Sequence, residues 1–256
     1  MRVLITETTW AAMAAARDME AAGLHLSRAT EAEGLVEYVR LGAQDAVVLA
    51  EDLPDTPAEA ALVRLRRADP DIPVVAIAEG GLDPDRRAAL YAAGADAVLA
   101  APVDGDELAA RLRAMVLRGA GFHTSRLCVR GLELDPASRS ACVGRRAVRL
   151  PGDGTDGPNR IPLSPREYDI LELLVLARGR TVSRAEIMDR LYAWEDEPGE
   201  RILDVFVARI RAKLSDAGLD PSMLQALRGR GFRLSPLDPS PGDAPDPGEG
   251  SSLSVA

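Results

Sequence analysis

The sequence has few of the residues on which catalysis, metal binding and disulfide scaffolds depend. Its 256 residues include two cysteines, two histidines and 4% aromatic residues. Cys128 and Cys142 are too few for a disulfide scaffold, and His25 and His123 lack the neighbours of a metal site or catalytic triad. No run of 18 apolar residues occurs, and the first residues lack the apolar region of a signal peptide. We therefore expect a cytoplasmic protein with no membrane span, no metal, no cofactor and no enzymatic activity.

The net charge of −9 conceals three segments of different character. Residues 1–119 hold 20 acidic and 12 basic residues, whereas residues 120–235 hold 19 basic and 16 acidic residues, a net charge of +3. Residues 236–256 hold four acidic residues and no basic ones, and are rich in Pro, Gly, Asp and Ser. We expect this tail to be disordered, because it has too little apolar surface to offset the entropy of ordering. Only the middle segment suits a polyanionic partner.

Residues 1–118 alternate between two hydrophobic patterns. Short apolar runs at 3–5, 47–49, 74–77 and 98–99 predict buried strands, with a weaker fifth candidate at 24–29. Helical patterns lie between and after them, at 9–22, 31–41 (with Thr30 as its cap), 57–68, 84–93 and 104–118. Five strand–helix pairs predict a parallel α/β sheet wrapped by helices, a fold that places function at the carboxyl ends of its strands.

Residues 126–235 have a different pattern, after a short linker at 119–125. Residues 126–163 predict hairpins, residues 165–218 predict three helices, and residues 224–234 predict a closing hairpin. Ser164 and Glu167 form a capping box at the first of these helices, and Ser183 and Glu186 repeat the arrangement at the second.

The third helix, predicted over residues 200–217, has two unlike sides. One side carries an apolar stripe of Leu203, Val207, Ile210 and Leu214. The other side and its edges carry Arg201, Asp204, Ala208, Arg209, Arg211 and Lys213. A helix with a buried stripe and an arginine-rich outer side suits the major groove of DNA, where arginine pairs with the edge of guanine.

Residues 126–234 resemble the winged helix-turn-helix output domain of OmpR/PhoB-type response regulators. The resemblance is carried by residues 163–168, 180–184, 204–214 and 227–234, and residues 196–206 further resemble the CtrA-like members. It implies that Arg201, Arg209 and Arg211 contact phosphates and bases, and that Arg228 and Arg230 reach DNA from the wing. It also implies that the loop at 192–199 faces RNA polymerase or a neighbouring subunit.

Residues 1–118 resemble the flavodoxin-like (βα)5 receiver domain that precedes this output domain in the family. A working receiver holds Mg²⁺ with carboxylates, phosphorylates an aspartate and uses a threonine and a lysine nearby. The matching positions here are Glu7, Thr8, Ala50, Ala78 and Ala101. A methyl group at position 50 cannot accept a phosphoryl group, so the resemblance implies a degenerate receiver. The three alanines either close the former pocket or leave room for an apolar or neutral ligand.

Two further expectations concern the receiver. Glu51 or Asp52 would have to replace the missing acceptor, but Glu51 should point away from the side of Ala50 in an extended strand. The family also implies a homodimer through a charged face, supported here by Leu90, Tyr91 and Val98. Its charged positions are Arg87, Asp96, Glu107, Arg111 and Arg118, with Arg87 matched to Glu107 and Asp96 to Arg111 or Arg118.

These patterns together predict a transcription regulator that binds promoter DNA as a dimer without receiver phosphorylation. Two alternatives remain: a conventional phosphorylation switch that uses Glu51 or Asp52, and an adaptor whose output domain contacts other proteins instead of DNA. Cys128 and Cys142 would face each other across a hairpin if they respond to oxidants, although buried free thiols are more common.

Overall fold

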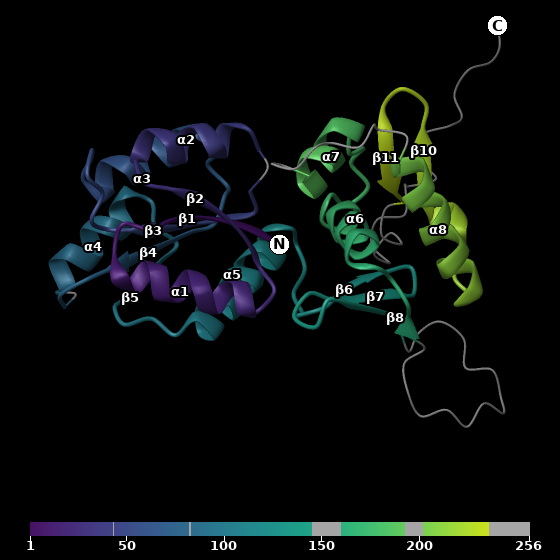
Figure 1. Ribbon diagram of the computed structural model, residues 1–256, viewed down its shortest axis with the longest axis horizontal. Coiled ribbons are helices and arrows are strands. Elements are labelled where there is room, and N and C mark those ends of the chain that lie inside the picture. Colours follow the sequence, from purple (N-terminus) through teal and green to yellow (C-terminus); the bar gives the residue numbers. More distant parts are fainter. Residues whose placement is uncertain (43, 82, 145–159, 193–201, 236–256) are drawn as a thin grey trace, which may run out of the picture.

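The computed structural model describes the chain except for residues 43, 82, 145–159, 193–201 and 236–256 (Figure 1). The expected disordered tail, the loop at 192–199 beyond Tyr192, and Arg201 therefore lie outside the described residues. None of the described helices is both long enough and apolar enough to cross a membrane.

The N-terminal domain is a three-layer α/β unit, as the sequence predicts. Its five strands form a parallel sheet in the order β2-β1-β3-β4-β5. Helices α1 and α5 share one apolar cluster with the sheet, and α2, α3 and α4 share another on the opposite face (Figure 1). The elements are β1 (Arg2–Thr6), α1 (Trp10–Ala21), β2 (His25–Ala29), α2 (Ala32–Arg40), β3 (Ala46–Ala50), α3 (Ala58–Ala68), β4 (Val74–Ala78), α4 (Pro84–Ala93), β5 (Ala97–Ala100) and α5 (Gly105–Gly119).

The position of each strand in the sheet explains its sequence. The central strands β3 and β4 are buried at every residue, because helices cover both faces. The weaker candidate β2 lies at the sheet edge and is partly exposed. One cap prediction is wrong: Thr30 does not cap α2, which has Glu31 at its N-cap without a side-chain bond. Asp55 accepts the free Ala32 N–H instead, at 3.0 Å, a tertiary contact that the local pattern does not contain.

The C-terminal domain places three helices between two small antiparallel sheets. A four-stranded sheet in the order β6-β7-β8-β9 comes first, and the hairpin β10-β11 closes the domain. Tyr168, Leu171, Ile210 and Phe232 belong to the single apolar cluster that joins these parts. The elements are β6 (Leu127–Val129), β7 (Leu132–Asp135), β8 (Ser140–Val143), β9 (Arg160–Ile161), α6 (Pro165–Leu176), α7 (Arg184–Tyr192), α8 (Ile202–Asp216), η1 (Pro221–Met223), β10 (Leu224–Leu227) and β11 (Gly231–Leu234).

The predicted capping box is present at α6 and present in part at α7. Ser164 and Glu167 form a reciprocal capping box at α6, with Pro165 in the first turn. At α7, Ser183 Oγ accepts the Glu186 N–H at 3.0 Å. The Glu186 carboxylate pairs with Arg180 at 2.7 Å, so this second box has only the serine half in the described contacts.

Candidate functional site

Helix α8 buries one stripe and exposes another. Leu203, Phe206, Val207, Ile210 and Leu214 are buried in the domain core. Its outer side exposes Asp204, Val205, Ala208 and Arg209. Val205 was not predicted as a surface residue, yet it is 47% exposed. The outer side therefore combines small apolar groups with an arginine, which suits close approach to base edges.

Two basic residues predicted to contact DNA have partners inside the domain. Arg211 donates from Nε and Nη2 to the carbonyl oxygen of Leu224, at 3.0 and 2.7 Å. Lys213 Nζ lies 2.6 Å from Oε2 of Glu167, which is 2% exposed. These contacts hold α8 against β10 and α6, so they favour a structural role for both residues over the predicted contact with DNA.

Another contact joins α8 to the helix that precedes it. Arg184, at the start of α7, donates to Asp204 Oδ1 at 2.5 Å, and its guanidinium lies 4.9 Å from the centre of the Phe232 ring. Asp204 thus links α8 to α7. Among the described basic residues of α8, Arg209 is the exposed one.

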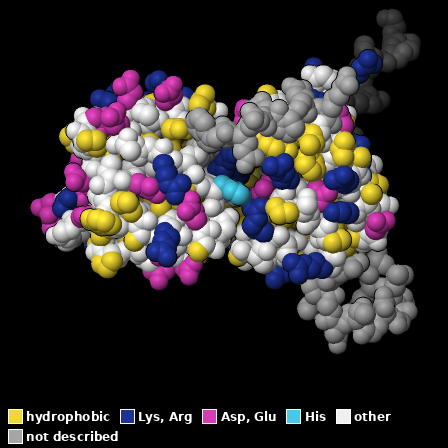
Figure 2. Space-filling view, viewed as in Figure 1, with side chains coloured by type: hydrophobic (Ala, Val, Ile, Leu, Met, Phe, Trp, Pro, Cys, Tyr) yellow, Lys and Arg dark blue, Asp and Glu magenta, His cyan; other side chains and the backbone are white. Residues whose placement is uncertain are grey.

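The hairpin β10-β11 presents two exposed arginines beside α8. Arg228 and Arg230 lie at its turn, where Gly229 has a φ of +70°. The base of the hairpin is fixed more firmly, because Gly231 lies against the backbone of Val182 and a Cβ there would meet Val182 O at 2.0 Å. Figure 2 shows Lys and Arg side chains spread over the C-terminal domain, while Asp and Glu are prominent on the N-terminal one. The exposed arginines match a surface for a polyanion.

The five positions expected to form a phosphorylation site do lie at one edge of the N-terminal sheet. Glu7 and Thr8 follow β1, Ala50 and Ala78 end β3 and β4, and Ala101 follows β5. Backbone hydrogen bonds tie this edge together, including Ala101 N–H to Ala78 O at 2.8 Å. The five positions that the resemblance assigns to a phosphorylation site therefore share one edge of the sheet in the structure.

The space around Ala50 is filled. Ala50 and Ala78 have no exposed surface, and Ala50 belongs to an apolar cluster with Ile5 and Ile77, against which Ala101 also packs. The Ala50 N–H donates to the buried hydroxyl of Thr6 at 2.6 Å. Of the two possibilities that the sequence left open, this packing favours a closed pocket over one that holds an apolar ligand.

The residues at this edge do not fit the Mg²⁺ ion that the fold family implies. Glu7, the only carboxylate at the expected positions, pairs with Arg28 at 2.8 Å. Ala50 supplies no oxygen from its side chain. Among the described residues, no three His, Cys, Asp or Glu side chains are grouped to hold a metal ion.

Glu51 has a partner that the sequence reading missed. Its Oε1 pairs with Arg86 Nε in the first turn of α4, and Arg86 also donates to Glu79 O at 3.4 Å. The Glu51 side chain is 14% exposed. Asp52 is exposed on the following loop. Glu51 Oε2 is buried and has no hydrogen-bond partner among the described residues. An acceptor carboxylate also needs a bound metal cation, and the cation beside Glu51 is the Arg86 guanidinium, which disfavours its use as a phosphoacceptor.

The expected dimer face is weaker than the sequence suggested. Leu90 is fully buried and Val98 is 8% exposed, so neither supports a surface contact, whereas Tyr91 is 45% exposed. Asp96 accepts from Val74 N at 2.6 Å and from Arg66 Nη2 at 2.7 Å, within its own chain. Glu107 pairs with Arg111 one helical turn away, at 2.8 Å. Arg87 and Arg118 are exposed.

The two cysteines do not face each other across a hairpin, which corrects that expectation. Cys128 is opposite Glu133 on β7, and Glu133 is opposite Cys142 on β8. Neighbouring strands lie about 4.8 Å apart, so sulfurs two strands apart are beyond the length of a disulfide. Burial raises the pKa of both thiols, as does the nearby Glu133.

The C-terminal domain matches a known protein family. The family described as "Transcriptional regulatory protein, C terminal" matches residues 158–234. The transcriptional regulatory protein QseB of Haemophilus influenzae is 30% identical over 194 residues, which cover 76% of this chain and 79% of QseB. The chain belongs to the OmpR/PhoB-type response regulators. This regulator is thus a DNA-binding transcription regulator with a winged helix, and not an enzyme.

Other relatives match almost the whole chain. The cell cycle transcriptional regulator CtrA of Caulobacter vibrioides is 28% identical over 235 residues, covering 91% of this regulator and 96% of CtrA. PrrA of Mycobacterium tuberculosis is 29% identical, covering 85% and 88% of the two chains. The crystal structure of DrrB, a Thermotoga maritima OmpR/PhoB homolog, covers 91% of this regulator and 98% of its own chain, with 19% identity and a TM-score of 0.38.

Proposed function

We propose that this regulator binds specific promoter sequences as a dimer and acts without phosphorylation of its N-terminal domain. The observation that carries the proposal is Ala50, whose methyl group occupies the acceptor position and is buried among apolar neighbours. A methyl group cannot attack a phosphoryl group, and Glu51, the carboxylate next to it in the chain, is paired with Arg86. Control would then come from the amount of protein, a partner or a ligand.

The proposed contacts with DNA are made by those of the predicted DNA-binding residues that are exposed. Arg209 and Ala208 on α8 face the major groove, and Arg228 and Arg230 on the hairpin reach the backbone or minor groove. Arg201 is kept as a proposed contact from the sequence alone. Asp204, Arg211 and Lys213 support the helix through the contacts described above, and so shape the interface without needing to touch DNA.

The proposed dimer uses the exposed residues of α4 and α5. Arg87, Tyr91 and Arg118 are exposed there, while Asp96 pairs with Arg66, and Glu107 with Arg111, within the same chain. Single exposed ion pairs contribute roughly 0–1 kcal/mol each. We therefore expect a weak dimer in solution that binding to two half-sites strengthens.

The test of phosphorylation independence uses acetyl phosphate, or beryllofluoride with Mg²⁺, on the full chain. We expect no mass increase with acetyl phosphate, no change in the spectrum of the N-terminal domain and the same affinity for DNA. A phosphorylated peptide that contains Glu51 or Asp52 would instead establish the conventional switch.

DNA binding is tested by measuring the affinity for a selected DNA site at increasing salt concentrations. If each monomer neutralises on the order of five phosphates, the log–log slope for a dimer is about −9. A slope near zero would favour the adaptor, as would binding that is unchanged in a folded Arg209→Ala variant.

A further inference from the structure

An ion pair joins the two domains across their interface. Asp45 lies directly before β3, at the amino edge of the N-terminal sheet, and Arg190 lies on α7 of the C-terminal domain. Arg190 donates from both terminal nitrogens, with Nη1 at 2.8 Å from Asp45 Oδ1 and Nη2 bonded to Oδ2. The Asp45 side chain is 15% exposed and the Arg190 side chain is 9% exposed. Such a bidentate pair fixes direction as well as distance.

The linker between the domains is also held in place. Leu117 at the end of α5 and Phe122 in the linker are buried in the apolar cluster of the C-terminal domain. Arg178 donates to the carbonyl oxygen of Ala120 at 3.2 Å, and its guanidinium lies 5.8 Å from the centre of the Phe122 ring. Gly121 has a φ of +74°, and a Cβ there would lie 2.0 Å from Arg178 Nη1. The linker is therefore packed against the domain that follows it.

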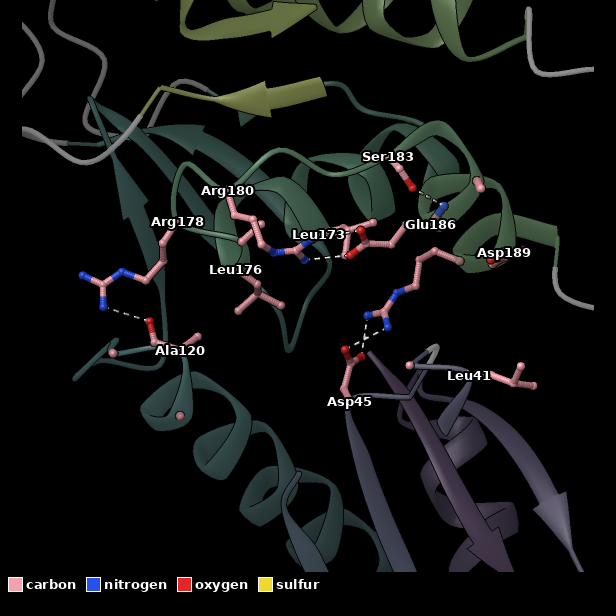
Figure 3. A pocket seen from close by; sticks show the side chains of 16 residues that line it. Leu41, Asp45, Ala120, Leu173, Leu176, Arg178, Arg180, Ser183, Glu186 and Asp189 are labelled. Atoms are coloured by element: carbon pink, nitrogen blue, oxygen red, sulfur yellow. Dashed lines mark hydrogen bonds and ion pairs between the residues drawn. The ribbon is translucent and has the colours of Figure 1, made fainter. Parts of the chain in front are cut away.

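Between these attachment points the interface is hollow. A cavity of about 650 Å³ separates them, lined by Leu41, Gly119, Leu176 and Asp189 among others from both domains (Figure 3). Continuous apolar packing therefore does not set the angle between the domains here. The angle depends instead on the linker at one side and, away from the linker, on two ion pairs: Asp45 with Arg190, and the Met1 ammonium with Glu172 on α6 at 3.2 Å.

This arrangement leaves the proposed DNA surface free. In Figure 1, α6, α7 and β6 lie toward the N-terminal domain, whereas α8 and the hairpin β10-β11 lie on the far side. Arg209, Arg228 and Arg230 are exposed in the docked arrangement. Docking and DNA binding are therefore compatible, and the contact is not one that blocks the recognition helix.

We propose that Asp45 and Arg190 are positioning residues that fix each winged helix relative to its receiver and so determine the half-site spacing that a dimer accepts. This inference rests on the proposed function, because spacing matters only to a DNA-bound dimer. A flexible linker lets the two DNA-binding domains of a dimer reach half-sites at many spacings with a similar binding free energy. A rigid connection loses the avidity of two-site binding when the half-site spacing does not match it. Burial alone would raise the pKa of Asp45, but Arg190 lowers it on balance, so the pair is charged at neutral pH.

The experiment measures binding of the full chain to duplexes that carry two selected half-sites with spacers varied one base pair at a time. We expect the native chain to prefer one spacer by on the order of tenfold or more. Asp45→Arg or Arg190→Glu should flatten the profile to less than about threefold, while affinity for a single half-site and the dimer mass from light scattering stay within about twofold. The double charge reversal should restore the preference.

Two further variants keep the result interpretable. Arg28→Glu removes two ion pairs within the N-terminal domain, with Glu7 and with Glu20, and should leave the spacing profile unchanged. If a single reversal fails to fold, the neutral pair Asp45→Asn with Arg190→Gln replaces it, and is also expected to flatten the profile.

The outcomes separate this inference from the proposed function. Folded single variants that bind as dimers with the native spacing preference would overturn the positioning role alone. A native chain that binds DNA as a monomer, with no spacing preference, would overturn both.

Discussion

Lys213 Nζ lies 2.6 Å from Glu167 Oε2, and the same carboxylate oxygen accepts the Ser164 backbone N–H at 2.7 Å. One buried carboxylate thus joins the capping box of α6 to the last turns of α8. The orientation of the recognition helix therefore depends on a group that touches no DNA.

The Glu167 contacts predict that the free energy of unfolding decreases at acidic pH. Burial alone would raise the pKa of Glu167, but the hydrogen bonds from Lys213 and from Ser164 N–H lower it below the ordinary 4.5. The folded state therefore binds this proton less readily than the unfolded state, so the stabilisation is present above about pH 4.5 and is lost as the pH falls through the lower folded pKa. Thermal unfolding measured from pH 7 to pH 3 should show this loss, with a shallower slope in Glu167→Gln. Equal slopes in both chains would refute the assignment.

Arg209 and Arg211 are two residues apart and should behave differently. Arg209→Ala removes an exposed cation, so we expect weaker DNA binding, a salt slope reduced by about 1 and unchanged stability. Arg211→Ala removes both donors to Leu224 O, so we expect a loss of about 1–3 kcal/mol in unfolding free energy. Salt titrations and urea unfolding of both variants provide the comparison. If Arg211→Ala were fully stable and only its DNA affinity fell, the helix would have to be rotated relative to this structure.

Ala50→Asp should harm the N-terminal domain without restoring phosphorylation. The new carboxylate would be buried among the apolar side chains of Ile5, Ile77 and Ala101, which costs at least several kcal/mol unless it is protonated. We expect a lower unfolding temperature and no phosphoryl group after treatment with acetyl phosphate. Ala50→Gly at the same position is the matched control for lost packing alone. Uptake of phosphate by Ala50→Asp would mean that the pocket opens readily.

Gly229 and Gly231 provide a matched pair in the hairpin. Both have positive φ, but Gly229 faces open space, whereas a Cβ at Gly231 would meet Val182 O at 2.0 Å. Gly229→Ala should cost about 1 kcal/mol from backbone strain alone. Gly231→Ala should cost clearly more, because backbone atoms must move. Chemical unfolding of both variants tests this order, and equal losses would contradict the close contact.

The sequence predicted most of the fold because local patterns determine most of it. The buried strands, the helices between them and the Ser164 capping box depend on residues close together in the chain. The Thr30 cap failed because Asp55, 23 residues from Ala32, satisfies that helix instead.

Contacts between distant residues account for what the sequence did not predict in the site. Periodicity marks Arg211 as a residue near the outer edge of α8, but only the fold brings Leu224 O within its reach. Asp45 and Arg190 are 145 residues apart, and nothing in either local pattern indicates the other. Leu90 was expected to support the dimer face, yet it is the one buried residue of α4.

The parallel sheet separates two roles by the length of a strand. The altered acceptor positions lie at its carboxyl edge, while Asp45 holds the C-terminal domain from the amino edge, about 16 Å away along five residues. The residues at the carboxyl end of β3 can therefore differ without disturbing the attachment at its amino end. A scaffold built in this way can vary the chemistry at one edge of its sheet and still hold the C-terminal domain from the other edge.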